Sequence, residues 1–202
     1  MRKISAIVLA AGQSRRMGCC KPLLLLGDKP AIRWCLDSLA GAGLDEVVVV
    51  LGTNGEEIAE NIAALPVTLA WNRAADSDMA GSVKIGLEQA SRESSAFLIF
   101  PVDYPLVAPA TIRRLLAEQD RYRDDIIIPT HQGRKGHPVL FPRPILEELA
   151  RFSTLREIIR HHPQRQRMLA VADEAVLLEM DTPAEYRQLQ TWMAQRGGPG
   201  PA

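Results

Sequence analysis

The stretch Leu9-Ala10-Ala11-Gly12-Gln13-Ser14-Arg15-Arg16-Met17-Gly18, with Lys21 shortly behind it, follows directly on an apolar run at residues 4–9. That run is typical of a buried strand, and the glycine after it lets the chain turn sharply. Successive backbone N–H groups in such a turn point into one concavity that suits an anion, and Arg15, Arg16 and Lys21 add positive charge around it. The pattern matches neither Gly-x-x-x-x-Gly-Lys-Ser/Thr nor Gly-x-Gly-x-x-Gly. It therefore indicates either a third kind of phosphate-binding turn or an ordinary strand-to-helix turn that carries arginines.

Around this turn, apolar runs alternate with amphipathic stretches, which is typical of parallel strands joined by helical crossovers. We predict strands at residues 4–9, 46–51, 67–71, 96–100 and 125–129. We predict helices at about residues 56–64, 82–90, 109–119, 144–151 and 155–161. Another helix is expected to have Asp28 as a candidate cap and Pro30 in its first position, because the apolar positions that follow have helical spacing: Ile32, Cys35, Leu36 and Leu39.

Beyond residue 130 the pattern changes to short extended runs at residues 139–141, 168–172 and 175–178. Such runs are typical of antiparallel or edge additions, so we expect a mixed sheet. Thr182, Pro183 and Glu185 make a cap, a first-position proline and a capping-box acid, and they predict a last packing helix. At 202 residues, 47% of them hydrophobic, the chain is long enough to bury one sizeable core. We expect one α/β domain over residues 1–195, a three-layer sandwich with a mostly parallel mixed sheet, and a disordered tail over residues 196–202.

The charge balance limits the partners of this protein. Lys plus Arg and Asp plus Glu both total 24, so no net basic field favours a nucleic-acid backbone or an anionic membrane surface. The longest apolar run, at residues 47–51, is far shorter than the roughly 20 residues of a membrane-spanning helix. The three cysteines show no spacing typical of zinc sites or of a disulfide framework. We expect a cytoplasmic protein that binds neither nucleic acid nor membrane and that holds phosphate through local groups.

Four further motifs follow the turn in order: DMAGSVKIGL at residues 78–87, VDYPLV at 102–107, GHPVLF at 136–141 and MDTPAEY at 180–186. Together with Leu-Ala-Ala-Gly-x-Ser-x-Arg-Met-Gly-x-x-Lys, they resemble the motifs of the molybdenum-cofactor nucleotidyltransferases, most of all the cytidylyltransferase branch. The resemblance covers nearly the whole chain. It implies a single nucleotide-binding α/β domain of the Rossmann-like type seen in nucleotide-diphospho-sugar transferases.

The resemblance implies that a nucleoside triphosphate binds along the turn and beside the second motif. The nucleotide-binding residues would be Leu9, Ala10, Ala11, Gly12, Ser14, Arg16, Lys21, Gly81 and Ser82. Lys21 and Arg15 would stabilise the charge that develops on the reacting phosphate. The cytidylyl branch carries Ala-Ala-Gly where the guanylyl branch carries Ala-Gly-Gly, so Ala11 favours CTP over GTP. Taken by itself, Ser82 is equally well explained as the N-cap of a helix.

Asp103 and Asp181 are the candidate ligands of a Mg²⁺ ion. Asp103 follows the strand predicted at residues 96–100, at the carboxyl edge of the sheet, where open α/β folds bind ligands. Carboxylate oxygens suit Mg²⁺, and the resemblance gives Asp103 a catalytic role and both residues a part in metal binding. Without the resemblance, Asp103 is equally well explained as a turn residue before Pro105. Asp181 is then explained as a negative charge that stabilises the N-terminal end of the last helix.

His137, Lys135 and Arg156 are the candidates for binding the acceptor substrate. The resemblance implies contacts with a phosphate or a pterin, whereas a lone histidine is more often a hydrogen-bonded structural residue. Two segments differ from the usual sequence motifs of this family. Val102-Asp103-Tyr104 stands where Gly-Asp-x is usual, and residues 152–157 keep the arginine of Gly-Asp-x-Gly-x-Arg without its glycines and acid. We expect Tyr104 to narrow the acceptor pocket.

The reaction implied by the resemblance is transfer of CMP from CTP to molybdenum-bearing molybdopterin, with Mg²⁺ as cofactor and release of pyrophosphate. A transient contact with a target molybdoenzyme or its maturation factor would follow. Three alternatives stay open: a non-catalytic chaperone that binds molybdenum cofactor, a nucleotidyltransferase that uses GTP or another phosphorylated acceptor, and, on fold alone, a nicotinamide-dependent oxidoreductase. The last lacks the Gly-x-Gly-x-x-Gly turn expected after its first strand.

Overall fold

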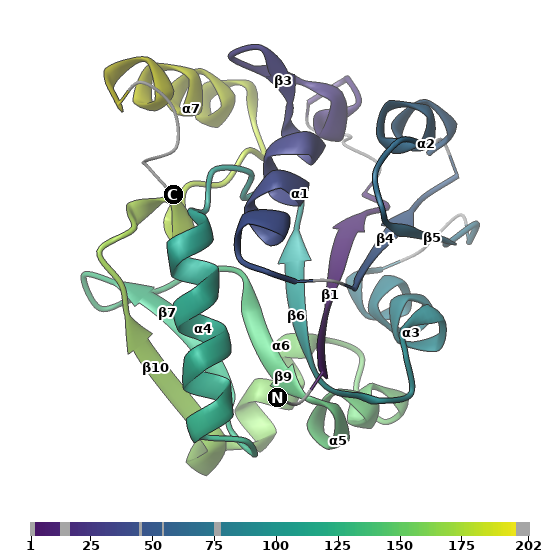
Figure 1. Ribbon diagram of the computed structural model, residues 1–202, viewed down its shortest axis with the longest axis vertical. Coiled ribbons are helices and arrows are strands. Elements are labelled where there is room, and N and C mark those ends of the chain that lie inside the picture. Colours follow the sequence, from purple (N-terminus) through teal and green to yellow (C-terminus); the bar gives the residue numbers. More distant parts are fainter. Residues whose placement is uncertain (1–2, 13–16, 45, 54, 75–77, 197–202) are drawn as a thin grey trace.

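The computed structural model describes residues 3–12, 17–44, 46–53, 55–74 and 78–196, with only the backbone of residue 196. Within these residues, eight strands form one mixed sheet (Figure 1). Its order is β10 (Gln166–Ala170), β7 (Ile126–His131), β9 (Val139–Pro142), β6 (Ser94–Pro101), β1 (Lys3–Ala10), β4 (Val47–Leu51) and β5 (Thr68–Trp71), and β8 (Arg134–Lys135) pairs with β7. β9 runs antiparallel to its neighbours β6 and β7, whereas β6, β1, β4 and β5 are parallel to one another.

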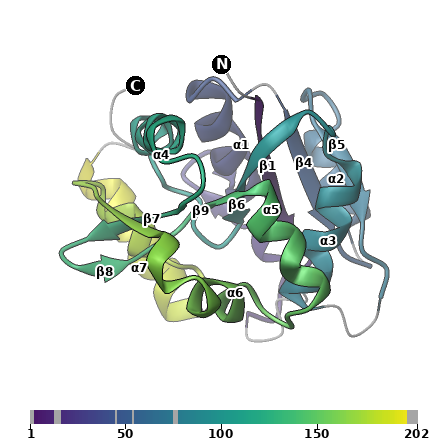
Figure 2. The same ribbon diagram turned by 90° about the horizontal axis from the view of Figure 1, so that it is seen from below.

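Helices cover both faces of the sheet and make three layers (Figure 1, Figure 2). One face carries α1 (Ala31–Gly41), α2 (Glu56–Ile62) and α4 (Pro109–Arg121), and the other carries α3 (Met79–Gln89), α5 (Arg143–Leu146) and α6 (Leu155–His161). α7 (Pro183–Arg196) packs beside a small hairpin of β2 (Leu25–Leu26) and β3 (Lys29–Pro30). Short 3-10 turns lie at Lys21–Leu23, Glu147–Ala150, Pro163–Arg165 and Glu174–Leu177. In the described part of the chain, no helix is both long and apolar enough to cross a membrane.

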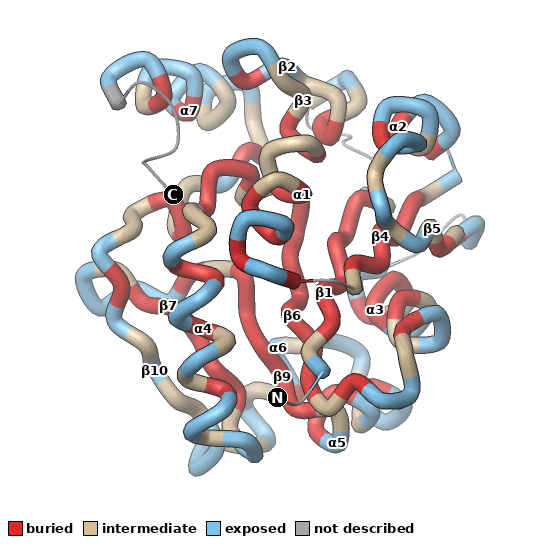
Figure 3. The backbone as a smooth tube through the Cα atoms, in the orientation of Figure 1, coloured by how far each residue is buried: buried red, intermediate tan, exposed pale blue. Residues whose placement is uncertain are grey.

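The central strands are buried on both faces, as Figure 3 shows for β1, β4 and β6. Along β1, Ala6, Val8 and Ala10 belong to the apolar cluster under α1, α2 and α4, whereas Ile7 and Leu9 belong to the cluster under α3, α5 and α6. Burying a side chain the size of Val8 or Ile7 completely stabilises a fold by about 1.5–3 kcal/mol. The sheet is therefore held between two apolar layers, and the ends of its strands form a fixed edge.

α3 lies close against the sheet because a glycine faces the strands. A Cβ atom on Gly86 would stand 2.5 Å from Ile7 Cγ2 and 3.1 Å from Val50 Cγ2. The helix begins after Asp78, whose carboxylate accepts a hydrogen bond from Gly81 N at 2.7 Å. This packing brings the first turn of α3 to the carboxyl end of β1.

The predicted fold class is confirmed, because the chain forms one α/β domain with a mostly parallel mixed sheet. Two element predictions are wrong. Of the run predicted as extended at residues 175–178, residues 175–177 lie in a 3-10 turn, and Asp173 accepts a hydrogen bond from Ala175 N at the start of that turn. The helix predicted over residues 144–151 is a short α5 followed by a 3-10 turn.

Two predicted helix starts are also wrong. Asp78 caps α3, so Ser82 lies inside the helix instead of preceding it. Pro30 pairs in β3 and immediately precedes α1, so Asp28 is not the residue next to that helix. Residue 196, placed in the tail by the sequence, ends α7, and residues 197–202 lie outside the described residues.

Candidate active site

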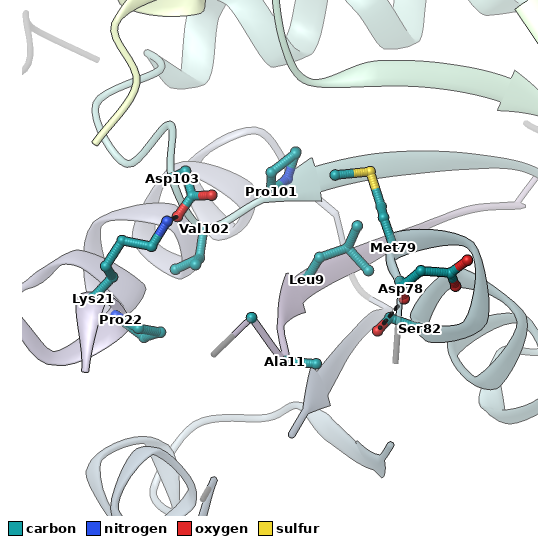
Figure 4. Close-up of a pocket in the computed structure, with 11 residues that line it drawn as sticks. Leu9, Ala11, Lys21, Pro22, Asp78, Met79, Ser82, Pro101, Val102 and Asp103 are labelled. Atoms are coloured by element: carbon teal, nitrogen blue, oxygen red, sulfur yellow. Dashed lines mark hydrogen bonds and ion pairs between the residues drawn. The ribbon is translucent and has the colours of Figure 1, made fainter. Parts of the chain in front are cut away.

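A pocket opens at the carboxyl ends of β1 and β6, which end side by side because Leu9 pairs with Pro101 in the parallel register. Figure 4 shows how its side chains converge. The lining residues are Leu9, Ala11, Gly12, Lys21, Pro22, Asp78, Met79, Ser82, Pro101, Val102 and Asp103. The structure thus brings together six residues that the sequence singled out: Leu9, Ala11, Gly12, Lys21, Ser82 and Asp103.

The turn after β1 forms one wall of this pocket. Ala11 and Gly12 line it, whereas Ala10 is buried in the cluster under α1, α2 and α4. Gly52, directly after β4, lets the backbone of its segment lie close to this turn, because a Cβ atom on Gly52 would stand 2.6 Å from Ala11 O. Ser14, Arg15 and Arg16, which were predicted to bind or act on the nucleotide, lie outside the described residues.

Three charged side chains from distant segments meet beside the pocket: Lys21 and Asp103 line it, whereas Asp181 contacts Lys21 and is absent from the lining residues. Lys21 begins the 3-10 turn Lys21–Leu23, Asp103 follows β6, and Asp181 precedes α7. Lys21 Nζ lies 2.9 Å from Asp103 Oδ1 and 2.7 Å from Asp181 Oδ1. The Lys21 side chain is only 11% exposed, against 29% for Asp103 and 21% for Asp181. Two carboxylates therefore converge on one ammonium group that is largely withdrawn from water.

Burial and charge act in opposite directions on this group. Burial lowers the pKa of the Lys21 ammonium, but the hydrogen bonds and charges of Asp181 and Asp103 outweigh it, so its pKa is raised. Burial raises the pKa of Asp103, Lys21 lowers it, and the charges of Asp181 and Glu179 raise it again, so the net shift is upward. A partly buried carboxylate in a pocket whose charge is incompletely compensated is typical of functional sites.

The first turn of α3 forms the third wall. Ser82 is buried, donates a hydrogen bond to Asp78 O at 3.2 Å and lies 3.1 Å from Asn72 Nδ2, which donates to it. Gly81 donates its backbone N–H to the cap and is absent from the lining residues. Met79, 52% exposed, stands at the rim. Asp78 and Met79 belong to the motif at residues 78–87 but were not predicted to line the site. Asn72, which holds Ser82 by a hydrogen bond, was missed because no pattern in the sequence singles it out.

His137 lies beside the residue that follows Asp103. Its ring centroid is 4.4 Å from that of Tyr104, whose hydroxyl donates a hydrogen bond to Glu179 Oε2 at 3.0 Å. Burial lowers the pKa of His137 to about 4, so the imidazole is neutral at pH 7. Gly136 lets the chain approach Val176 closely, since a Cβ atom there would collide with Val176 O, and His137 N donates to that same oxygen at 2.9 Å.

The other acceptor candidates lie away from the pocket lining. Lys135 is exposed on β8, where its Nζ donates to Gln166 Oε1 at 3.1 Å. Arg156 is exposed on α6, which packs against α5 and the 3-10 turn that follows it. Cys20 directly precedes the 3-10 turn Lys21–Leu23, and burial raises the pKa of its thiol, which disfavours a reactive thiolate there.

Comparison of the sequence with known proteins gives one family match and several relatives. The sequence model described as "MobA-like NTP transferase domain" matches residues 6–168. The bifunctional protein GlmU of Paramagnetospirillum magneticum is 30% identical over 142 residues, which cover 65% of this chain and 31% of that protein. A probable molybdenum cofactor guanylyltransferase of Natranaerobius thermophilus is 32% identical over 130 residues, or 64% of this chain and 62% of the relative. The aligned part thus spans only about a third of GlmU.

Solved structures show the same architecture. Rv0371c from Mycobacterium tuberculosis H37Rv superimposes with a TM-score of 0.83 and 29% identity, covering 94% of this chain and 97% of that one. A structure of Rv0371C in complex with manganese gives a TM-score of 0.79 and 28% identity, covering 94% and 98%. The likeness therefore extends over nearly the full length of both chains.

Proposed function

The chain belongs to the MobA-like NTP transferase domain family, and from that premise we propose that it transfers a nucleotide from a nucleoside triphosphate to a phosphorylated acceptor, with release of pyrophosphate. We propose CTP as the donor and molybdenum-bearing molybdopterin as the acceptor. The observation that carries the proposal is the convergence of Lys21, Asp103 and Asp181 beside the turn after β1. This arrangement offers one cation for a phosphate and two carboxylates for a metal ion.

Asp103 and Asp181 would hold a divalent cation, for which we propose Mg²⁺. Their Oδ1 atoms already approach the same nitrogen, Lys21 Nζ, at 2.9 and 2.7 Å, so the two carboxylates point at one centre of positive charge. Carboxylate oxygens are the ligands that Mg²⁺ and Mn²⁺ prefer, and Rv0371C has been crystallised with manganese. When bound, such an ion neutralises charge on phosphate oxygens.

Lys21 and the turn would hold the donor phosphates. The raised pKa of Lys21 keeps its ammonium charged, and its burial strengthens an interaction with the α-phosphate. An oxygen of the acceptor phosphate would attack the α-phosphorus, forming a new P–O bond. The bond from the α-phosphorus to the bridging oxygen breaks, and pyrophosphate leaves with that oxygen. In this scheme Asp103 acts by holding the metal, and no covalent enzyme intermediate is required.

The base of the donor would lie between the turn and the start of α3. Ala11 and Ser82 line the pocket from these two sides, and Met79 stands at the rim. We propose that Ala11, in place of the glycine of the guanylyl pattern, favours the smaller pyrimidine. The guanylyltransferase relative makes GTP the competing donor.

The acceptor would lie on the side of Asp103 that faces Tyr104 and His137. Their ring centroids lie 4.4 Å apart with the ring planes tilted by 30°, and we propose that these aromatic side chains contact a planar ring system of the acceptor. The neutral imidazole would offer a hydrogen bond without a positive charge. Lys135 and Arg156 stay predictions for this role, as does a transient contact with a target molybdoenzyme or its maturation factor.

The test is to incubate the purified chain with Mg²⁺, molybdenum-bearing molybdopterin and CTP, GTP or ATP in turn, and to measure pyrophosphate. We expect release from CTP to exceed release from GTP and ATP. Release from GTP or ATP but never from CTP would show that the base assignment is wrong. Release that occurs only with other phosphorylated acceptors would overturn the acceptor assignment.

Asp103→Ala separates an enzyme from a cofactor-binding chaperone. The variant should lose pyrophosphate release, whereas Asp120→Ala, at an exposed acidic residue of α4, should keep it. A chaperone would deliver molybdenum cofactor to an apo-molybdoenzyme equally well before and after Asp103→Ala. Delivery that survives unchanged, with no pyrophosphate released by the unsubstituted protein, contradicts the proposal.

A further inference from the structure

A second group of metal-binding side chains lies where α6 ends. Glu148 belongs to the 3-10 turn Glu147–Ala150, His161 is the last residue of α6, and His162 follows it. One ligand atom from each of the three side chains lies within 4.8 Å of the other two. We propose that Glu148, His161 and His162 form a binding site for a divalent transition-metal ion of the zinc class, separate from the nucleotide pocket.

The spacing of two of these ligands already fits such an ion. His162 Nε2 lies 3.0 Å from Glu148 Oε2 and 3.1 Å from Glu148 Oε1. In a tetrahedral zinc site with bonds of about 2.0–2.1 Å, neighbouring ligand atoms are separated by about 3.3 Å. An ion can therefore replace the proton shared by these two groups with little movement of either side chain.

The third ligand must move farther, and its surroundings allow this. His161 is exposed, and its ring packs against Phe152 at 5.1 Å and edge-on against His162 at 5.1 Å. Because His161 is exposed and its ligand atom already lies within 4.8 Å of the other two, its side chain can turn toward them without displacing a core residue. Glu148 and His162, whose side chains are 28% and 20% exposed, are held more firmly.

The choice of metal follows from the ligand atoms. Two imidazoles and one carboxylate are a set used by zinc sites that keep a fourth position for water. Imidazole nitrogens favour Zn²⁺, Cu²⁺ and Ni²⁺ over Mg²⁺, whereas the two carboxylates of the pocket favour Mg²⁺ or Mn²⁺. The ion would tie the turn after α5 to the end of α6, two segments that otherwise meet at the surface of the domain.

The test titrates ZnCl₂ into the full-length chain, freed of metal by a chelator, and follows binding by calorimetry with excess Mg²⁺ present, so that an ion preferring oxygen ligands occupies the carboxylates of the pocket. We expect one zinc ion per chain. His161→Ala and Glu148→Gln should each weaken binding by at least about tenfold, since even outer-shell changes at metal sites cost 10- to 100-fold. His131→Ala, at a histidine of β7, and Asp103→Asn should bind zinc as the unsubstituted chain does.

A second measurement guards against misfolded variants. Zinc should raise the melting temperature of the unsubstituted chain and of His131→Ala more than that of His161→Ala. Because His161 is exposed, its loss should not unfold the domain. Equal zinc affinity in His161→Ala, Glu148→Gln and the unsubstituted chain overturns the proposal. So does zinc binding that is lost in Asp103→Asn, because the ion would then occupy the nucleotide pocket.

Discussion

β1 has a lysine paired with a carboxylate near each of its ends. At the start, Lys3 Nζ lies 3.2 Å from Glu46 Oε1, and Glu46 also accepts hydrogen bonds from Ser5 Oγ, Ser94 Oγ and Ser91 N. At the carboxyl end, Lys21 is shared by Asp103 and Asp181. The two clusters use the same kinds of groups at opposite edges of one sheet.

Exposure does not distinguish the two clusters, but hydrogen bonding does. The side chain of Glu46 is 22% exposed and that of Asp103 is 29% exposed. Burial raises the pKa of Glu46, yet hydrogen bonds from Ser5, Lys3, Ser94 and Ser91 outweigh it, so its pKa is lowered. Burial raises the pKa of Asp103, and Lys21 offsets only part of that. The difference indicates that the first cluster stabilises the fold, whereas the second is arranged for a ligand.

The largest expected effect is on the rate of nucleotide transfer, when the lysine of each cluster is replaced in turn. Lys21→Met should lower nucleotide transfer by about 10²–10³ in kcat, the range found when one donor to a developing oxyanion is removed. Lys3→Met should leave the rate unchanged, because Lys3 lies at the other edge of the sheet and its side chain is 40% exposed. The measurement is pyrophosphate release at saturating nucleotide. A Lys21→Met variant that keeps more than about a tenth of the rate, or an equal loss in both variants, contradicts the contrast.

The next effect concerns His137, another incompletely compensated group near the pocket. Its Nδ1 is buried, with no hydrogen-bond partner among the described residues. Its pKa is about 4 in the folded chain, against about 6.5 when unfolded. Between these values the unfolded chain binds a proton that the folded chain excludes, so stability falls as pH falls from about 6.5 to about 4. Fully developed, the loss is about 3 kcal/mol.

The measurement is the free energy of unfolding in urea at pH 7 and at pH 4 for the unsubstituted chain and for His137→Gln. Glutamine cannot take up the proton, so the loss between the two pH values should be smaller in this variant by up to about 3 kcal/mol. Carboxylates titrate in both chains and cancel in the difference. His131→Gln, at a histidine on β7, is the control for replacing any histidine. The same pH dependence in His137→Gln and the unsubstituted chain would contradict the expectation.

Part of the pocket could be predicted from the sequence because strand order fixes it. Leu9 lies at the carboxyl end of β1 and Asp103 follows the parallel strand β6, so the alternation of strands and helices alone brings them to the same edge. The contact between Lys21 and Asp181 is different, because these residues are 160 positions apart. It depends on where α7 packs, and that is set partly by two-residue strands with no sequence signal of their own.

Local competition explains the other failures. Ser82 is a residue type that favours helix caps, but Asp78 stands four positions earlier and accepts the hydrogen bond from Gly81. The buried hydrogen bond from Asn72, the residue after β5, to Ser82 of α3 could not be predicted from any local pattern in the sequence. The Glu46 cluster was missed for the same reason, since Ser5 and Ser94 meet only when β1 and β6 pair. Arrangement of the backbone was predictable, whereas side-chain pairing across elements was not.

The smallest expected effect compares the two carboxylates directly through stability. Glu46→Gln removes a charge that accepts several hydrogen bonds, and hydrogen bonds to charged groups contribute about 1.5–3 kcal/mol. We expect this variant to lose about 1–3 kcal/mol at pH 7, with nucleotide transfer unchanged. Because the pKa of Glu46 is lowered in the folded chain, that difference should shrink as pH falls through the pKa of the folded state.

Asp103→Asn should give the opposite result. Folding raises the pKa of Asp103, so the charged form is disfavoured at pH 7 and a neutral amide removes that cost. Lys21 keeps Asp181 as a partner at 2.7 Å, so the substitution does not leave an unpaired buried ammonium, which would otherwise be strongly destabilising. We expect the free energy of unfolding to stay equal or rise while nucleotide transfer is lost. If both variants lose stability to the same extent in urea, hydrogen bonding does not separate the two clusters, and Asp103 is as much a structural residue as Glu46.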